Sequence, residues 1–460
     1  MYSILTVLIA AAFVILGVLL HKKSPAKFDI FLKVAVLTFC VIGNLRYPLS
    51  DGIMLVVDGA DVPQSLLRWG YHIGYAVLPM AVFFKRRLFR NIATCFSLPM
   101  SLLAVICYNS TFSYFMTQND GTWLIDASWR HVIYIAELTL AVAIPTLLLV
   151  AKGHRMNVKS RSEWLNMLAA IPAALFMMMP AWLIQSLFGY GNSIVEPKSF
   201  GLMHFSWIAY MIIACIVISR IFMHKEESVK HELCIFIAIA QVFHTMSIFL
   251  KGFTFHRVPL QLCCIAAFFY LYTMITRNKN FFNFCFISNM VGAFIAVVLM
   301  DVNSNALSFW NIHYMQEHSF VIILPIVALS IGLFPRINRT ALKPITLIFV
   351  CYFVFCLVSG TILNVLSTNP DPTFYEVNYF YMFDFECALD YVPFAGFTGL
   401  IAIPIGRTTL YPLLIVFIFF VFLAICYLFY FMMQGIYALK DRITSAHRMN
   451  TKPERIPVHK

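Results

Sequence analysis

The residues best suited to chemistry lie in one short stretch, residues 255–264, and in a single histidine further along the chain. The stretch reads Phe-His-Arg-Val-Pro-Leu-Gln-Leu-Cys-Cys and opens a long apolar run. A cysteine attacks an ester as its thiolate, and an ordinary thiol has a pKa of about 8.5, so Cys263 needs a base or a cation close by. His318, which begins a later apolar run, is the candidate base. Such a pair could take an acyl chain from an ester and hold it as a thioester.

The composition indicates that this chemistry would take place in a membrane. The chain has 460 residues, of which 61% are hydrophobic and 12% charged, and its mean hydropathy is +0.81. Soluble domains carry about 25% charged residues. The apolar runs are about 17–25 residues long, which suits helices that cross about 30 Å of hydrocarbon and not the shorter, alternating strands of a barrel. We therefore predict an all-α, polytopic transmembrane helical bundle.

Length and polarity predict about thirteen spans. They cover roughly residues 3–20, 28–45, 66–84, 91–108, 131–150, 165–187, 200–222, 233–250, 258–275, 284–300, 319–334, 345–366 and 410–434.

The charges predict the orientation of the chain and exclude some partners. Every second loop is basic, so the positive-inside rule places the N-terminus outside and the C-terminus in the cytoplasm of a cell-membrane protein. The net charge of +12 is spread over these short loops, which argues against a nucleic-acid partner. The twelve cysteines lie mostly inside apolar runs without CxxC spacing, so we expect no metal site and no cofactor.

An internal repeat predicts the domain organisation. A polar opening at residues 68–75 and a basic turn at 85–90 resemble the stretch 255–264 and the turn at 277–283. The two openings are six spans apart, an even number, so the repeats should be parallel. We predict an N-terminal repeat of about six helices (residues 1–195), a C-terminal repeat of about seven helices (196–437) and a basic cytoplasmic tail (438–460).

The repeats differ at the predicted nucleophile. Aligning residues 70–74 with residues 259–263 keeps a histidine, His72, but places Gly74 opposite Cys263. The N-terminal repeat is therefore expected to be a degenerate copy without a nucleophile, whose His72, His131 and Glu137 could be accessory. An acid inside a membrane span is a functional candidate by default.

A family resemblance rests on the motif at residues 259–263 and on residues that follow it at matching places in the helix order. Pro-Leu-Gln-Leu-Cys looks like Pro-Leu-His-Leu-Cys, and Asn283, His318, Asn364 and Asn369 support the match. In these features residues 200–433 resemble the YwaF-type bacterial membrane proteins, which belong with the eukaryotic multipass acyltransferase of ether-phospholipid remodelling. The resemblance implies an integral membrane acyltransferase that moves a fatty acyl chain between lipids through a cysteine. This chain departs from the pattern at Gln261, where the family has histidine.

The predicted roles follow from helix order. Cys263, His318 and Asn364 should fall at one depth near the outer face, because each lies near the outer end of its predicted helix. Cys263 would attack the phospholipid donor, His318 would act as base and then as acid, and Asn364 or Gln261 would bind the oxyanion. The acceptor would be a lyso-lipid or another hydroxyl or amine.

The neighbours of this predicted site have weaker assignments. His256 and Arg257 would act as nearby substrate contacts. Cys264 should face about 100° away from Cys263, so we expect at most one of the two thiols in a given site.

Two other functions stay open. The chain could be a catalytically inactive membrane scaffold, in which Cys263 is a small apolar residue, His318 an interfacial anchor and Asn364 a helix cap. It could instead be a secondary transporter, because parallel repeats with embedded polar residues fit that outline. The long outer segment 367–409 could be a lid, and its apolar part 392–405 could dip into the membrane interface.

Overall fold

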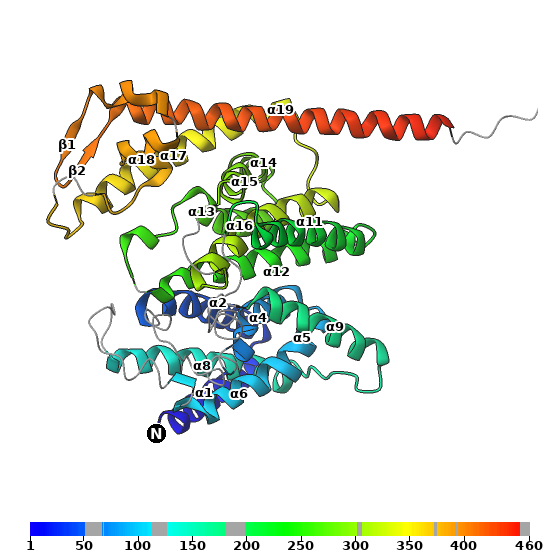
Figure 1. Ribbon diagram of the computed structural model, residues 1–460. Coiled ribbons are helices and arrows are strands. Elements are labelled where there is room, and N and C mark those ends of the chain that lie inside the picture. Colours follow the sequence, from blue (N-terminus) through cyan, green and yellow to red (C-terminus); the bar gives the residue numbers. More distant parts are fainter. Residues whose placement is uncertain are drawn as a thin grey trace, which may run out of the picture. The chain divides into compact units, whose positions relative to one another are not determined.

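The computed structural model describes most of the chain (Figure 1). The described residues are 1–50, 67, 69–109, 111–112, 127–179, 198–251, 253–300, 306–371, 375–391 and 393–450. Arg68 of the predicted repeat, residues 180–187 of one predicted span and residues 451–460 of the predicted tail lie outside them.

The structure is a helical membrane bundle, as the composition predicts. In the described part of the chain, ten helical stretches are long and apolar enough to cross a membrane. They run over Tyr2–Lys23, Pro25–Arg46, Arg87–Ile106, Trp129–Val150, Leu202–Phe222, Glu227–Phe249, Lys279–Val298, Phe309–Ser330, Arg339–Val365 and Pro412–Ile443. The other three predicted spans fall on a helix of only 15 residues, α13, and on two stretches that lie partly outside the described residues.

The chain divides into two compact units, and the first of them extends past the predicted repeat boundary at residue 195. The first unit comprises Met1–Arg277 and Ala293–Leu333, and the second comprises Asn278–Gly292 and Phe334–Lys460. The predicted repeats concern similarity along the sequence and not compactness, so the domain boundaries stay a prediction.

The first unit holds most of the helices. These are α1 (Tyr2–Lys23), α2 (Pro25–Ser50), α4 (Gly74–Pro79), α5 (Arg87–Ile92), α6 (Leu98–Ile106), α8 (Ala127–Val150), α9 (Arg161–Met177), α11 (Leu202–Phe222), α12 (Glu227–Met246), α13 (Leu262–Thr276) and α16 (Phe309–Ser330). Helix α1 packs on α2 and α8, and α12, α13 and α16 pack on one another. Buried residues fill 83% of the membrane-length windows of α12 and α16 but only 6% of that of α11. Polar side chains on α12 and α16 are therefore kept from lipid, whereas the apolar surface of α11 is left to face it.

The second unit combines helices with a small loop domain. Helices α14 (Lys279–Phe284), α17 (Leu342–Val365), α18 (Phe385–Tyr391) and α19 (Pro412–Asn450) belong to it, and α15 (Met290–Val298) begins in it. The predicted outer segment folds as short 3₁₀ helices at Tyr379–Tyr381 and Pro393–Leu400 and a hairpin of β1 (Ile403–Ile405) and β2 (Thr408–Leu410). Phe394 and Leu400 are 77% and 79% exposed, so this segment presents apolar side chains.

Local structure repeats along the chain. Lys85 and Arg277 both adopt the left-handed conformation, with φ of 60° and 55°. After each of them an α-helix begins two positions later, a π-helical turn eight positions later and a further α-helix thirteen positions later. The two π-helical turns are Ala93–Ser97 and Cys285–Asn289. Residues that stand the same number of positions from Lys85 and from Arg277 therefore correspond to each other, and we call this correspondence the structural register.

Candidate functional site

The candidate site is built around the broken connection between α12 and α13. Helix α12 ends at Met246, two 3₁₀ turns follow at Ser247–Lys251 and Phe255–Arg257, and α13 begins at Leu262. Helix α13 has 15 residues, or about 22 Å, which is shorter than the roughly 30 Å hydrocarbon layer. Its first turn packs beside the ninth and tenth residues of α16, Glu317 and His318, and not beside the beginning of that helix.

The structure brings Cys263 and His318 together. The thiol of Cys263 lies near enough to the ring of His318 for the two groups to interact electrostatically. Nδ1 of His318 lies 2.6 Å from the carbonyl oxygen of Tyr314, one helical turn earlier. A carbonyl oxygen can only accept, so Nδ1 carries the proton and donates it. Nε2 is then the nitrogen that can take a proton from the thiol.

Both cysteines face α16, so the expectation that only one of them points into the site is wrong. The two sulfurs are 3.9 Å apart, and Cys264 donates to Glu317 Oε2 at 3.6 Å. The two residues lie in the first turn of α13, and helical side chains lean toward the N-terminus of their helix. A helix that passes this end can therefore meet both thiols.

Glu317 is a buried acid that the sequence analysis missed. Its Oε1 accepts a hydrogen bond of 2.8 Å from Thr245 Oγ1 on α12, and its Oε2 accepts from Cys264. His313 Nε2 lies 3.9 Å from Oε2, and Glu317 is only 3% exposed. The prediction that α16 begins near residue 319 is wrong, because Ser308 caps it and it starts at Phe309. That error placed Glu317 in a loop, whereas an acid inside a span would have been noticed.

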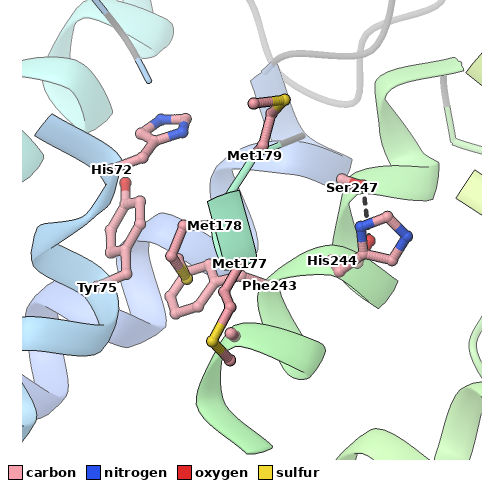
Figure 2. A pocket seen from close by; sticks show the side chains of 9 residues that line it. His72, Tyr75, Met177, Met178, Met179, Phe243, His244 and Ser247 are labelled. Carbon is pink, nitrogen blue, oxygen red and sulfur yellow. Dashed lines mark hydrogen bonds between the residues drawn. The ribbon is translucent and has the colours of Figure 1, made fainter. Parts of the chain in front are cut away.

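A pair of histidines fastens the end of α12 to α16. The rings of His244 and His313 stack with centroids 4.6 Å apart, and His244 Nε2 donates to the carbonyl oxygen of His313 at 3.1 Å. Ser247 donates to the carbonyl oxygen of His244 at 2.6 Å. His244 and Ser247 line one side of a narrow pocket, and His72 and Tyr75 line the other, with three methionines between them (Figure 2).

The predicted oxyanion donors lie in different settings. Gln261 is the N-cap residue of α13, and its side chain makes no capping hydrogen bond. Asn364 belongs to the second unit, where Nδ2 donates to the carbonyl oxygen of Val377 at 3.0 Å. Its Oδ1 accepts from the amides of Glu376 and Val377 at 2.6 and 2.8 Å. Asn364 thus fastens the outer segment to α17, and its place at the depth of Cys263 stays a prediction.

His256 and Arg257 end the 3₁₀ turn that precedes α13. His256 is exposed and Arg257 is half-buried. They stand seven and six residues before Cys263 in the chain, and the extended residues Val258 and Gln261 separate them from the helix.

The accessory residues form a second buried cluster, of which His131 is not a part. Arg46 Nη1 lies 2.7 Å from both carboxylate oxygens of Glu137 and from the hydroxyl of Tyr71. Arg46 Nη2 lies 2.7 Å from His72 Nε2. All four residues are at most 2% exposed. His131 instead stacks on Tyr2 and lies 3.1 Å from the hydroxyl of Tyr108.

The two clusters occupy matching places in the structural register. Tyr71 and His72 stand fourteen and thirteen residues before Lys85, as Cys263 and Cys264 do before Arg277. The alignment of Gly74 with Cys263 is therefore wrong by this count, because Tyr71 stands there. The alignment failed because it matched the short motif on a histidine, whereas the conformation of the chain repeats from the left-handed residue.

The comparisons with known proteins give one match. No curated protein and no solved structure matches the chain. The model of the TMEM164 family matches residues 199–432, which are more than half of the 460 residues. The matched segment contains Cys263, Glu317 and His318. The chain belongs to the TMEM164 family of multipass membrane proteins.

Proposed function

We propose that the protein is an integral membrane acyltransferase that moves a fatty acyl chain between lipids through a thioester on Cys263. The observation that carries this proposal is the pairing of the Cys263 thiol with a His318 ring whose other nitrogen is fixed by Tyr314. A base held in one tautomer against a thiol is the arrangement that nucleophilic catalysis needs. The likeness of residues 259–263 to the Pro-Leu-His-Leu-Cys motif of YwaF-type proteins supports the same conclusion.

Acylation would proceed in two steps, attack by the thiol and collapse of the tetrahedral intermediate. His318 Nε2 takes the proton of Cys263 as the sulfur attacks the ester carbonyl carbon of a phospholipid. When the tetrahedral intermediate collapses, the carbon–oxygen bond of the ester breaks and His318 returns its proton to the departing lyso-lipid hydroxyl. The acyl chain remains on the sulfur. Deacylation repeats these steps in reverse with a second lyso-lipid, or another hydroxyl or amine, as the attacking group.

Glu317 would stabilise the imidazolium that forms during each step. In the N-terminal half the matching carboxylate, Glu137, is paired with the guanidinium of Arg46. Among the described residues no arginine lies within ion-pair distance of Glu317, and the groups beside it that can become cations are His313 and His318. A negative charge at Glu317 therefore favours proton transfer from Cys263 to His318. This role differs from that of the acid in a serine-protease triad, because Tyr314 and not Glu317 accepts from Nδ1.

The beginning of α13 offers the oxyanion site. The first N–H groups of an α-helix have no carbonyl partner within the helix, and the helix dipole is positive there. Cys263 and Cys264 lie in this turn, and the Gln261 side chain is next to it without a capping bond. Their amides and the Gln261 carboxamide can therefore donate to an oxygen bound to the attacked carbon.

The lipid substrate follows from the setting of the site. The broken connection before α13 carries Arg257, whose guanidinium suits the phosphate of a phospholipid, and His256 beside it. The predicted orientation, with the N-terminus outside, would place the site toward the outer face of a cell membrane.

The experiment that tests the proposal is acyl trapping with an alkyne-tagged phospholipid. Wild-type protein in proteoliposomes should acquire a label that hydroxylamine removes. Cys263→Ala should lose the label and Cys264→Ala should keep it. A label that persists in Cys263→Ala would remove the proposed nucleophile, and the absence of any label in folded wild type would favour an inactive scaffold.

A further inference from the structure

Four cations converge on a pocket in the first unit, where α2 begins and α8 ends. Lys33 comes from α2, Lys85 from the left-handed turn, Arg90 from α5 and Lys152 from the residues after α8. Among the described residues that line this pocket, Asp29 is the one carboxylate, and three aliphatic side chains complete the lining. We call these five charged residues the basic pocket.

The cations of the basic pocket share one acid, whereas their neighbours have acids of their own. Arg86 pairs with Glu232, and Arg87 pairs with Glu163 at 2.7 Å. Within the pocket, Lys152 pairs with Asp29. Among the described residues, no carboxylate lies within ion-pair distance of Lys33, Lys85 or Arg90. The positive charge of the pocket is therefore balanced only in part by the protein.

The contacts of Arg90 and Lys33 leave their charged groups available to a ligand in the pocket. Arg90 Nε donates to the carbonyl oxygen of Ala81 at 3.2 Å, which anchors the guanidinium at its base. The ammonium of Lys33 lies 5.9 Å from the centre of the Phe83 ring. An arginine anchored through Nε still presents its terminal N–H groups, which match the oxygens of a phosphate.

The second half of the chain shows that the fold does not require cations at this place. In the structural register Arg90 corresponds to Phe282, since each stands five residues after its left-handed residue. Phe282 stacks on Phe334 with centroids 3.9 Å apart. Lys152 corresponds to Gly332, since each stands seven residues after the proline inside its helix. Lys85 corresponds to Arg277, which pairs with Glu227. The matching place therefore lacks the counterparts of Arg90 and Lys152, and its remaining cation has an acid of its own, so the basic pocket is a property of the N-terminal half.

We propose that the basic pocket binds the phosphate group of an anionic ligand, with a preference for a doubly charged phosphomonoester over a phosphodiester. Three cations without acids of their own can balance two negative charges, and a pocket at helix ends lies at the depth of lipid headgroups. The phosphate could belong to a membrane lipid or to a soluble molecule. The site lies outside residues 199–432, so it does not depend on the acyl-transfer proposal.

Native mass spectrometry of the full chain in nanodiscs tests the proposal. Phosphatidylcholine discs would contain either phosphatidic acid, a phosphomonoester, or phosphatidylglycerol, a phosphodiester. Wild type should retain phosphatidic acid in preference to phosphatidylglycerol. Inorganic phosphate added to discs of phosphatidylcholine alone distinguishes a soluble source, because it would then raise the melting temperature without any lipid ligand. Equal retention of the two lipids, with no effect of phosphate, would overturn the proposal.

Two sets of variants separate the pocket from general surface charge. The triple variant Lys33→Gln, Lys85→Gln and Arg90→Gln should weaken retention at least about tenfold, the effect of losing one or two charge-assisted hydrogen bonds. Its matched control, Lys22→Gln, Lys23→Gln and Lys27→Gln, removes three exposed cations that do not line the pocket and should retain the lipid. Equal loss in both variants would contradict a specific site.

A variant that binds the lipid more tightly cannot be explained by unfolding. Asp29→Asn removes the carboxylate of the pocket and releases Lys152, so it should tighten phosphatidic acid binding. Unchanged or weaker binding in a folded Asp29→Asn protein would contradict the proposal.

Discussion

Glu137 and Glu317 occupy the same position in the two halves of the chain, each eight residues before the proline inside its helix. Each carboxylate meets residues that stand thirteen or fourteen positions before the left-handed residue of its half. Glu137 meets Tyr71 and His72 through Arg46, and Glu317 meets Cys264 directly. The fold thus buries an acid twice and surrounds it with different partners. In one half the acid holds an arginine, and in the other it lies beside two thiols and two histidines.

Glu317→Gln should slow the acylation of Cys263 by about a hundredfold, the lower end of what an acid–base group contributes. The amide keeps the shape of the side chain but removes the charge that would stabilise the His318 imidazolium. Single-turnover labelling with the tagged phospholipid measures this rate. Thr245→Val is the matched control, because it removes one hydrogen bond to Glu317 and leaves the charge, so its effect should be smaller. A Glu317→Gln protein that is folded and acylates at the wild-type rate would remove Glu317 from the mechanism.

His318→Gln should reduce the rate at which iodoacetamide alkylates Cys263, since the thiol loses its proton acceptor. Peptide mass spectrometry follows each cysteine separately. Cys95 and Cys351 are exposed and serve as internal controls whose rates should stay constant. An unchanged rate at Cys263 would show that the histidine does not act on this thiol.

Glu137→Gln should destabilise the protein by about 3–5 kcal/mol, because it leaves the buried guanidinium of Arg46 without its carboxylate. The double variant Glu137→Gln, Arg46→Leu should recover part of this loss, since no charge then remains buried. Denaturation in detergent measures both. We expect the folded fraction of each variant to acylate normally, because this cluster has a tyrosine where the other has the nucleophile. A catalytic defect without loss of stability would instead give Glu137 a role in the reaction.

His154 should make stability depend on pH near neutrality. Burial is the main cause that lowers its pKa below 6.5, and the charges of Arg90 and Arg87 act in the same direction. A histidine that is harder to protonate when folded contributes stability that is complete above pH 6.5 and is lost as the pH falls below that value. The melting temperature should therefore decrease by a few degrees at most between pH 7 and pH 5. His154→Gln should remove this part of the decrease, and an identical decrease in the variant would contradict the assignment.

Glu163 contributes a separate dependence at lower pH. The amide of Asn157 is the main cause that lowers its pKa below 4.5, and Asn91 and Arg87 also lower it. The stability it provides is present above pH 4.5 and is lost as the pH falls below that value. The two effects are thus distinguishable by their pH ranges.

The bundle was predictable because a segment that crosses lipid must satisfy its backbone hydrogen bonds internally, and an apolar run of this length does so as a helix. The sequence also predicted that Cys263 and His318 would meet. It did not predict Glu317, since Asn311, His313 and Gln316 made the beginning of α16 look like a polar loop. These side chains are buried against other helices, and one sequence does not show which polar residues will find partners. Helix α13 was predicted to begin four residues too early, because residues 258–261 are apolar enough to extend it, whereas Val258 and Gln261 adopt an extended conformation.

The basic pocket was hidden for a related reason. Lys85 and Arg90 lie in one basic loop and Lys152 in another, and each loop alone is an ordinary sign of membrane orientation. Lys33 lies inside the predicted span 28–45. Only the packing of α2, α5 and α8 shows that Lys33, Arg90 and Lys152 line one cavity.

The central claim is that acyl chains pass from lipid to lipid through Cys263. Its most direct test is an exchange assay in proteoliposomes that contain a phospholipid with a ¹³C-labelled acyl chain and a deuterated lyso-lipid. With wild type, lipid mass spectrometry should find the ¹³C chain on the deuterated lipid, and with Cys263→Ala it should find none. Exchange that continues in Cys263→Ala would contradict the claim.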